Sequence, residues 1–426
     1  MMLGLVSVLL INLIDTFYIS LIGVEELVAI SFTFPVTFTI MSFSFGIGIG
    51  TSAVISRAIG EGNNNKVKRL TTDSLSLVTL IILAISGLSY YFLDFIFFSI
   101  GATYESLLLI KEYMIPWLAG VVFVVTPIVG NNAIRATGDT ITPSIIMVIM
   151  AVINAVLDPI LIFGLGPFPE LGIKGASIST VISYFVIMIV SFWVLGIREK
   201  MLTKNLLNFN EIFKSWKALL QIGIPSMFTQ LLFPISNLIL TRIAAGLGDA
   251  TVAAYGVGSK VESISMIGLI ALSSVIIPFV GQNFGAKNFE RIKNANHFSL
   301  RFAIIWGLSS WILLALLSTI IASTFATDII VQELIKEFFW IVPFGFAFQG
   351  ISQIISASCN ALDRPLHSTS INFMRLFAFL IPSTYIGSII FGSKGFFIGI
   401  ALGNLATGIV AWFWFRNNIL PKALEN

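Results

Sequence analysis

Long apolar runs recur along the whole chain, and they leave few folds open to it. A helix needs roughly 20 consecutive apolar residues to cross a bilayer, and runs of that length follow one another through the 426 residues. The chain is 57% hydrophobic and 11% charged, whereas a typical soluble domain has about 25% charged residues. A soluble core of this size could not bury so much apolar surface. The sequence therefore predicts an all-α membrane protein.

We expect twelve transmembrane helices. Their predicted ranges, each good to about two to four residues at either end, are 2–22, 28–56, 74–99, 107–136, 142–164, 173–196, 217–246, 250–281, 298–325, 330–361, 366–391 and 395–417. The first run continues directly into Asp15 and Thr16 without a small-residue cleavage site, so we interpret it as a mature span and not as a signal peptide. Gly46, Gly48 and Gly50 favour close packing or bending in the second predicted helix.

Basic residues are distributed unevenly between the two sets of loops. Most of the 24 Lys and Arg follow even-numbered helices or lie in the C-terminal tail, and one such stretch contains Arg198, Lys200, Lys204, Lys214 and Lys217. Because cytoplasmic loops carry the excess of Lys and Arg, we expect a multi-pass plasma-membrane protein with both termini in the cytoplasm. No basic cluster alternates with stacking aromatic residues, so the net charge of +3 does not indicate a nucleic-acid partner.

The chain also repeats itself. A shift of 225 residues places Asn12–Thr16 over Asn237–Thr241 and Gly60–Asn63 over Gly285–Asn288, without a gap. Six predicted helices separate the copies, and because this number is even, both copies cross the membrane in the same direction. We therefore expect two six-helix lobes related by a pseudo-two-fold axis, at 1–197 and 217–426, joined by a cytoplasmic linker at 198–216. Transporters built in this way place their substrate path between the repeats, which requires no second subunit, so we expect a monomer.

Three carboxylates lie in the middle of apolar runs: Asp15, Asp158 and Glu262. An ionisable group in hydrocarbon costs several kcal/mol unless it faces a cavity or a partner, so each of them is a candidate functional residue. The repeat places Leu240 opposite Asp15 and Ser383 opposite Asp158. Since symmetric folding demands cannot explain acids in one copy only, this asymmetry predicts ion-driven transport.

Several motifs resemble the multidrug and toxic compound extrusion (MATE) family. Asp15–Gly23 resembles that family's first helix, and Gly60–Asn63 and Gly281–Lys287 resemble its paired loops after the second and eighth helices. Arg135–Thr140 and Ala361–Pro365 are similar to its turns at the corresponding places in the two halves. The resemblance covers nearly the entire chain. It implies a secondary active transporter that exports organic, cationic or amphipathic compounds in exchange for H+ or Na+ by alternating access.

The resemblance also implies a coupling site. In family members that couple through their first half, the matching positions form a hydrogen-bonded network, and here they read Asp15, Tyr113, Asn154, Asp158 and Thr180. Ala176 lies one turn before Thr180, and Asn131 is a looser candidate that could line the cavity.

Two ions suit these side chains. Two carboxylates held close in a low dielectric cannot both stay ionised cheaply, so one would take up a proton. Alternatively, oxygen atoms of Asp15, Asn154, Asp158 and Thr180 would suit Na+.

In the second half, Lys260–Glu262 resembles a basic-x-Glu feature of the family, so Glu262 and Lys260 are candidates for the substrate cavity. Glu262 would attract a cationic substrate.

One departure from the family concerns Pro225, because its repeat partner would be position zero. Relatives commonly carry a proline there, so we expect either further residues upstream or a shortened first helix, which would weaken coupling through bending of that helix.

Two other classes of protein make different demands on the sequence. A flippase for lipid-linked oligosaccharides would need a strongly cationic cavity, and Lys260 is the basic residue that we find in mid-span. A membrane-embedded enzyme would need a metal or His-Asp constellation, whereas His297, His367 and Cys359 are isolated in sequence. We therefore expect no enzyme activity and no cofactor apart from the coupling ion.

Overall fold

A computed structural model describes residues 1–203 and 208–425, and these residues form helices joined by short loops. Lys204, which the sequence placed in a basic cytoplasmic loop, lies outside the described residues. Contacts between residues divide the chain into two compact units, Met1–Met227 and Phe228–Asn426.

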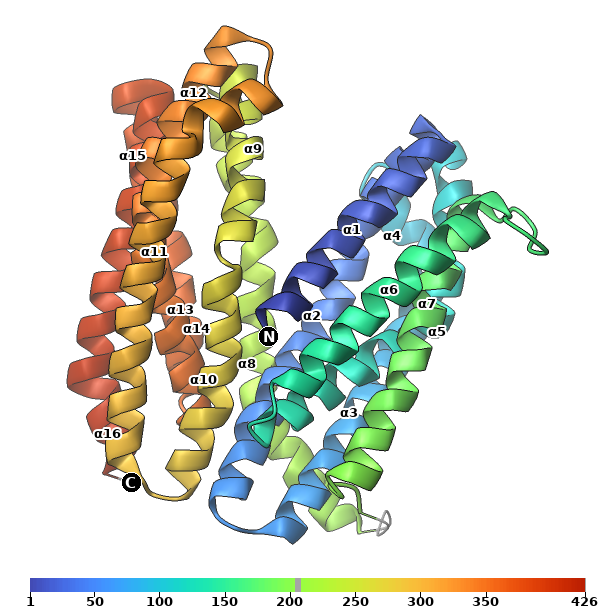
Figure 1. Cartoon of the computed structure of the whole chain (residues 1–426), viewed down its shortest axis with the longest axis vertical. Helices are drawn as coiled ribbons and strands as arrows, with labels where there is room; N and C mark the ends of the chain where they lie inside the picture. The colour runs from blue at the N-terminus through green and yellow to red at the C-terminus, as the bar shows by residue number, and fades with distance from the viewer. Residues whose placement is uncertain (204–207, 426) are drawn as a thin grey trace. The chain divides into compact units, whose positions relative to one another are not determined.

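The first unit contains the helices of the first sequence repeat and the beginning of the next helix (Figure 1). Its elements are α1 (Met2–Ile22), α2 (Val24–Gly60), α3 (Asn64–Tyr91), α4 (Leu93–Ser99), α5 (Tyr104–Ala136), α6 (Ile141–Phe163), α7 (Gly172–Trp193), the π-helical segment η1 (Val194–Arg198) and α8 (Phe209–Ala245), which continues into the second unit. The predicted third span is broken at Phe92 into α3 and α4. Residues 209–216, predicted to belong to the linker, are part of α8.

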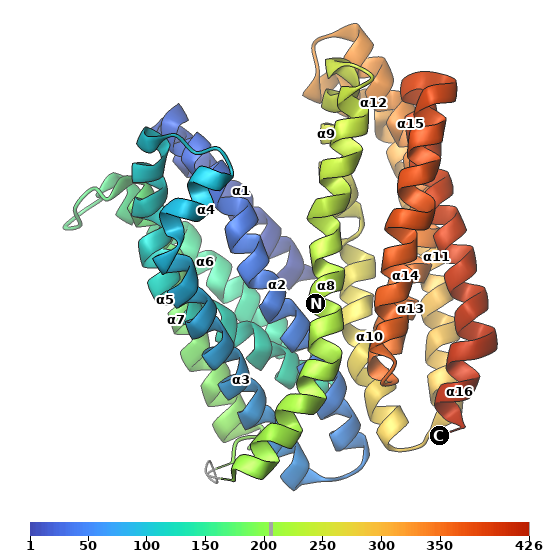
Figure 2. The ribbon, with the colours of Figure 1, turned by 180° about the vertical axis from the view of Figure 1, so that it is seen from behind.

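The second unit has more interruptions within its spans (Figure 2). Its elements are α9 (Asp249–Ser265), α10 (Ile267–Gly285), α11 (Phe289–Phe325), α12 (Ile329–Ile341), the 3-10 segment η2 (Val342–Gly345), α13 (Phe346–Ala361), α14 (Pro365–Phe373), the π-helical η3 (Met374–Leu380), α15 (Ile381–Trp414), the π-helical η4 (Phe415–Ile419) and α16 (Leu420–Leu424). Phe391 and Gly392 leave helical geometry inside α15 and separate the last two predicted spans. With these breaks, the helices correspond to the twelve predicted spans.

The loops that follow the second helix of each copy have the same construction. Asn63 accepts a hydrogen bond from the backbone N–H of Lys66 at 3.0 Å and caps α3, and Asn288 does the same for Arg291 at 3.4 Å and caps α11. The residue before each cap has a left-handed backbone, with φ of 71° at Gly62 and 56° at Lys287. The two copies of the repeat predicted from the sequence therefore form equivalent turns.

Glycines bring α2 close to α8 within the first unit. A Cβ added to Gly46 would lie 2.5 Å from the carbonyl oxygen of Gly223, and one added to Gly50 would lie 2.6 Å from that of Leu219. Small residues let helix backbones approach in this way, so the structure confirms the close packing predicted for the second helix.

Asp139 ties the beginning of α6 to the end of η1. Its Oδ1 accepts hydrogen bonds from the backbone N–H groups of Ile141 at 3.0 Å and Thr142 at 2.9 Å. Arg198 forms an ion pair with its Oδ2 and donates to Thr142 Oγ1 at 2.7 Å. Partial burial alone would raise the pKa of Asp139, but the hydrogen bonds from Thr142, Arg198 and Ile141 outweigh it and hold that pKa below its ordinary value.

Candidate coupling site

Asp158 lies fully buried on α6, a helix that packs against both α1 and α7. Its Oδ1 accepts a hydrogen bond from Asn154 Nδ2 at 3.1 Å and another from the hydroxyl of Ser179 on α7. Asn154 Nδ2 also lies 3.1 Å from Ser179 Oγ, so the three side chains form a closed triangle. Asn154 and Asp158 share a helix face because they are four residues apart, as the sequence predicted. The triangle fixes the direction in which the Asp158 carboxyl group points.

The Asp15 carboxyl group, on α1, lies within hydrogen-bonding reach of Asp158. One oxygen of each, Asp15 Oδ1 and Asp158 Oδ2, is buried and receives no hydrogen bond from the described residues. Two charged carboxylates about 4 Å apart repel by about 4 kcal/mol at an effective dielectric constant of about 20. A single proton held between them would remove that repulsion and give both oxygens a partner. The arrangement therefore suits the uptake of one positive charge.

Aromatic residues line this acid pair, by which we mean Asp15 and Asp158. Tyr113 on α5 interacts electrostatically with both acids, and Tyr184 on α7 interacts with Asp15. Tyr113 also packs against an apolar cluster that includes Ala176. Tyr113 was predicted from the sequence and Tyr184 was not, although Tyr184 lies four residues after Thr180 and hence on the same face of α7.

On α7, the hydroxyl that reaches Asp158 belongs to Ser179 and not to the predicted Thr180. Thr180 Oγ1 instead donates to the carbonyl oxygen of Ala176, at 3.1 Å. The buried face of α7 contains Ala176, Ser179 and Ser183, which recur every three or four residues, whereas Thr180 is only partly buried. Ala176 contributes a backbone acceptor and an apolar contact. The 3.6-residue period of the buried small residues was the signal that could have identified Ser179.

Asn131 lies far from the acid pair. It follows Tyr113 by 18 residues on the same helix, α5, which separates them by about 27 Å along the helix axis. Asn131 is buried and its Oδ1 has no hydrogen-bond partner among the described residues. The structure does not bring it together with the other predicted coupling residues.

The second unit holds a separate polar network around Glu262, on α9. Gln349 Nε2 on α13 donates to Glu262 Oε1 at 3.2 Å, and Gln349 Oε1 accepts from Asn404 Nδ2 on α15 at 3.3 Å. Asn404 Oδ1 in turn accepts from Arg375 Nε on η3 at 3.2 Å. These four side chains, which we call the Arg375–Glu262 relay, join a cation to an anion through two amides.

Two sequence-based expectations change as a result. Lys260 was the basic residue found in mid-span, but Arg375 also lies within a predicted span, at 366–391, and it was overlooked. Lys260 is exposed, whereas Glu262 and Arg375 are partly buried and interact electrostatically. Glu262 is therefore not an isolated acid that waits for a cationic substrate.

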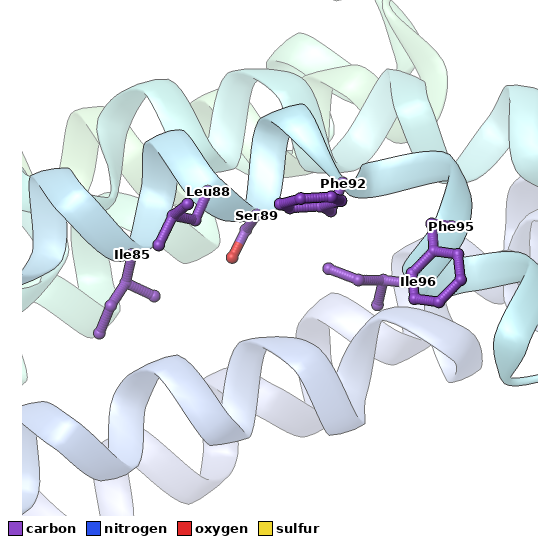
Figure 3. Close-up of a pocket in the computed structure, with 6 residues that line it drawn as sticks. All are labelled: Ile85, Leu88, Ser89, Phe92, Phe95 and Ile96. Carbon is purple, nitrogen blue, oxygen red and sulfur yellow. The ribbon is translucent and has the colours of Figure 1, made fainter.

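An open pocket of about 390 Å³ lies where α3 meets α4 (Figure 3). Its lining is Ile85, Leu88, Ser89, Phe92, Phe95 and Ile96, so it is almost wholly apolar. None of the candidate coupling residues lines it. Leu88 is 60% exposed on α3, a helix long and apolar enough to span a membrane, and Phe95 is 71% exposed on the short helix α4. Such exposed apolar side chains suit contact with lipid tails.

Comparisons with known proteins agree with this architecture. The MatE family model matches residues 1–160 and 225–386, and its two matches begin 224 residues apart, close to the repeat shift found in the sequence. The chain is 38% identical over 412 residues to an FAD transporter from Shewanella oneidensis, covering 97% of this chain and 91% of that protein. It is 28% identical over 378 residues to the probable multidrug resistance protein YoeA of Bacillus subtilis, covering 86% and 80%.

Solved structures show the same fold. The crystal structure of the Vibrio cholerae MATE transporter VcmN in its bent form superimposes with a TM-score of 0.94 and 29% sequence identity, covering 100% of this chain and 94% of that one. The agreement extends over both six-helix halves, as the resemblance predicted.

Proposed function

Because the chain belongs to the MatE family of transporters, we propose that it exports small organic compounds in exchange for protons, with the acid pair as the coupling site. The observation that carries the proposal is the pair of unsatisfied buried oxygens, Asp15 Oδ1 and Asp158 Oδ2, on carboxyl groups that face each other. A protein gains nothing in stability from two repelling acids in one lobe, so their retention supports a role in ion uptake.

A proton suits the acid pair better than Na+ does. Asn154 presents its amide nitrogen to Asp158, and Ser179 presents a hydroxyl donor, so Asp158 Oδ1 is already occupied by donors. Thr180, one of the four Na+ ligands expected from the sequence, directs its hydroxyl to a backbone carbonyl. A Na+ ion would require these groups to reorient, whereas a proton needs only the two free oxygens.

Exchange follows if proton binding and substrate binding favour different conformations of the two lobes. Neutralising the acid pair removes a repulsion between α1 and α6 of about 4 kcal/mol, and a change of that size can shift a two-state equilibrium by nearly three orders of magnitude. We propose alternating access of this kind, with both termini in the cytoplasm and the single chain as the working unit.

The substrate class is open to direct test. The names of the relatives refer to FAD in one case and to multidrug resistance in the other, so FAD and the cationic dye ethidium are suitable probes. Purified protein in liposomes would receive a proton gradient or a Na+ gradient, with Asp15→Asn beside the wild type. Efflux of either probe that follows the proton gradient and is lost in Asp15→Asn supports the proposal, whereas efflux driven by Na+ alone refutes the proton assignment.

Flipping of a lipid-linked oligosaccharide is the alternative function, and one observation favours it. Arg375 adds a partly buried basic residue to the second lobe, and such a substrate carries phosphate. Gradient-independent movement of a lipid-linked phosphate across liposomes, with no efflux of FAD or ethidium, would support the flippase over the exporter.

A further inference from the structure

The guanidinium group of Arg375 is only partly used by the protein. Its Nε donates to Asn404 Oδ1 at 3.2 Å. Its Nη1 and Nη2 make no hydrogen bond to the described residues, yet neither is among the fully buried polar atoms that lack a partner. Neither nitrogen is therefore fully enclosed, and the two present N–H donors side by side on a partly buried side chain.

The Arg375–Glu262 relay holds the guanidinium in this orientation. No direct ion pair joins Arg375 to Glu262 in the described part of the chain, because Gln349 and Asn404 lie between them. The charges at the two ends dictate how the amides point: each turns its oxygen toward Arg375 and its nitrogen toward Glu262. The relay thus fixes the Nε edge of the guanidinium and leaves the opposite edge free.

The position of Arg375 in the fold supports a role in binding. It lies in the π-helical segment η3, and such segments inside α-helices occur often at functional sites. Its partner Asn404 stands at the repeat position of Ser179, since the two differ by 225 residues. Ser179 donates to the buried anion Asp158, whereas Asn404 accepts from the partly buried cation Arg375. Equivalent helices of the two lobes therefore hold groups of opposite charge.

We infer that the Nη1–Nη2 edge of Arg375 binds an anionic group, a phosphate or a carboxylate, of the transported compound. A planar guanidinium offers two parallel N–H bonds to the two oxygens of such a group, and this geometry separates arginine from lysine. The inference rests on the proposed export function and narrows it to substrates that carry negative charge. It replaces the cationic substrate that Glu262 suggested in the sequence.

Binding measurements test this inference without any gradient. Protein in nanodiscs of phosphatidylcholine would be titrated with FAD, with FMN and with riboflavin, which has the same ring system but no phosphate. We expect Arg375→Gln to weaken FAD and FMN binding by about tenfold or more, as the loss of charge-assisted hydrogen bonds implies, and to leave riboflavin binding unchanged. Arg375→Lys, which keeps the charge but loses the two parallel donors, should give an intermediate loss.

Two controls separate binding from folding. Lys394→Gln removes the same charge from an exposed side chain of the second unit, 62% accessible, and should leave all three affinities unchanged. Thermal unfolding of each variant would show whether the protein remains folded. Equal weakening of FAD and riboflavin binding in Arg375→Gln, or FAD binding within about twofold of the wild type, would overturn the inference.

A second arm distinguishes the source of the anion. Undecaprenyl phosphate added to the nanodiscs would compete with FAD at an Arg375 site that accepts a lipid-linked phosphate, and it would not compete if the site takes soluble anions only. Failure of wild-type protein to bind either molecule overturns the inference. The proposed function fails separately, through the absence of proton-driven efflux or through unchanged efflux in Asp15→Asn.

Discussion

Replacing Asp158 by Asn should abolish coupled transport without lowering the stability of the protein. The amide keeps the shape of the carboxyl group, so its oxygen still accepts from Asn154 and Ser179. Its nitrogen takes the place of the unsatisfied Oδ2 and can donate to Asp15 Oδ1, the other buried oxygen without a partner. The variant thus imitates an acid pair that holds a proton permanently.

The expected magnitude follows from the arrangement of the charges. The substitution removes a repulsion of about 4 kcal/mol between like charges about 4 Å apart, and the new hydrogen bond to a charged group adds about 1.5 to 3 kcal/mol. The hydrogen bonds from Asn154 and Ser179 become weaker because they end on a neutral oxygen, and this offsets part of the gain. We expect a midpoint of thermal unfolding at or above that of the wild type, measured at neutral pH in the same detergent.

Asp73 provides a matched control in the same unit. It is a buried aspartate of α3 whose Oδ2 lies 2.8 Å from Arg69 Nε, so it has the opposite-charge partner that Asp158 lacks. Asp73→Asn should therefore destabilise the protein by about 3 kcal/mol, since it leaves Arg69, whose side chain is only 11% exposed, without its main counter-charge. Destabilisation of equal size in Asp73→Asn and Asp158→Asn, or proton-driven efflux by Asp158→Asn, would refute the reasoning.

Three further predictions concern the first unit. Ser179→Ala should slow proton-driven efflux by about tenfold, because it removes a hydrogen-bond donor to the acid pair. Thr180→Ala should keep the efflux rate within about twofold of the wild type. A larger loss in Thr180→Ala than in Ser179→Ala, measured in liposomes, would contradict the hydrogen-bond assignment. Gly46→Ala should lower the midpoint of thermal unfolding, because the added Cβ would meet a backbone oxygen. Gly87→Ala should keep or raise that midpoint, because no atom lies within 4 Å of the added Cβ. Equal effects of the two substitutions would refute close helix packing at Gly46. Asp139→Asn should lower the free energy of unfolding by an amount that is constant from neutral pH to about pH 4 and disappears at lower pH. The reason is that a carboxyl group with a lowered pKa contributes stability that is lost only as the pH falls through its folded-state pKa. A difference between variant and wild type that grows in acid would contradict the lowered pKa.

The spans and the repeat were predictable from sequence because each depends on local composition. Long apolar runs specify helices across a bilayer whatever surrounds them, and Asn63 and Asn288 cap their helices through residues three positions away. The acid pair was predictable because a carboxylate in an apolar run is costly. The break at Phe92 falls in an apolar run that has no proline, so the sequence did not indicate it.

Side-chain partners on different helices were harder to predict. Choosing Ser179 over Thr180 requires the rotation of α7 about its axis, and one residue along a helix turns the side chain by about 100°. The Arg375–Glu262 relay joins four helical segments that are distant in sequence, so no local pattern connects its members. Arg375 was also hard to identify as a mid-span charge, because the polar residues Asn372 and Ser370 lie near it in the same predicted span.

The central claim is that the acid pair exchanges protons for an organic substrate, and substrate-driven proton movement tests it most directly. Liposomes containing the purified protein and a pH-sensitive dye would receive a gradient of FAD or ethidium, with no imposed ion gradient. We expect protons to move against the direction of substrate movement in the wild type, and this flux to be absent in Asp15→Asn and Asp158→Asn. Substrate movement without proton flux in the wild type, or an undiminished proton flux in both variants, would contradict the account.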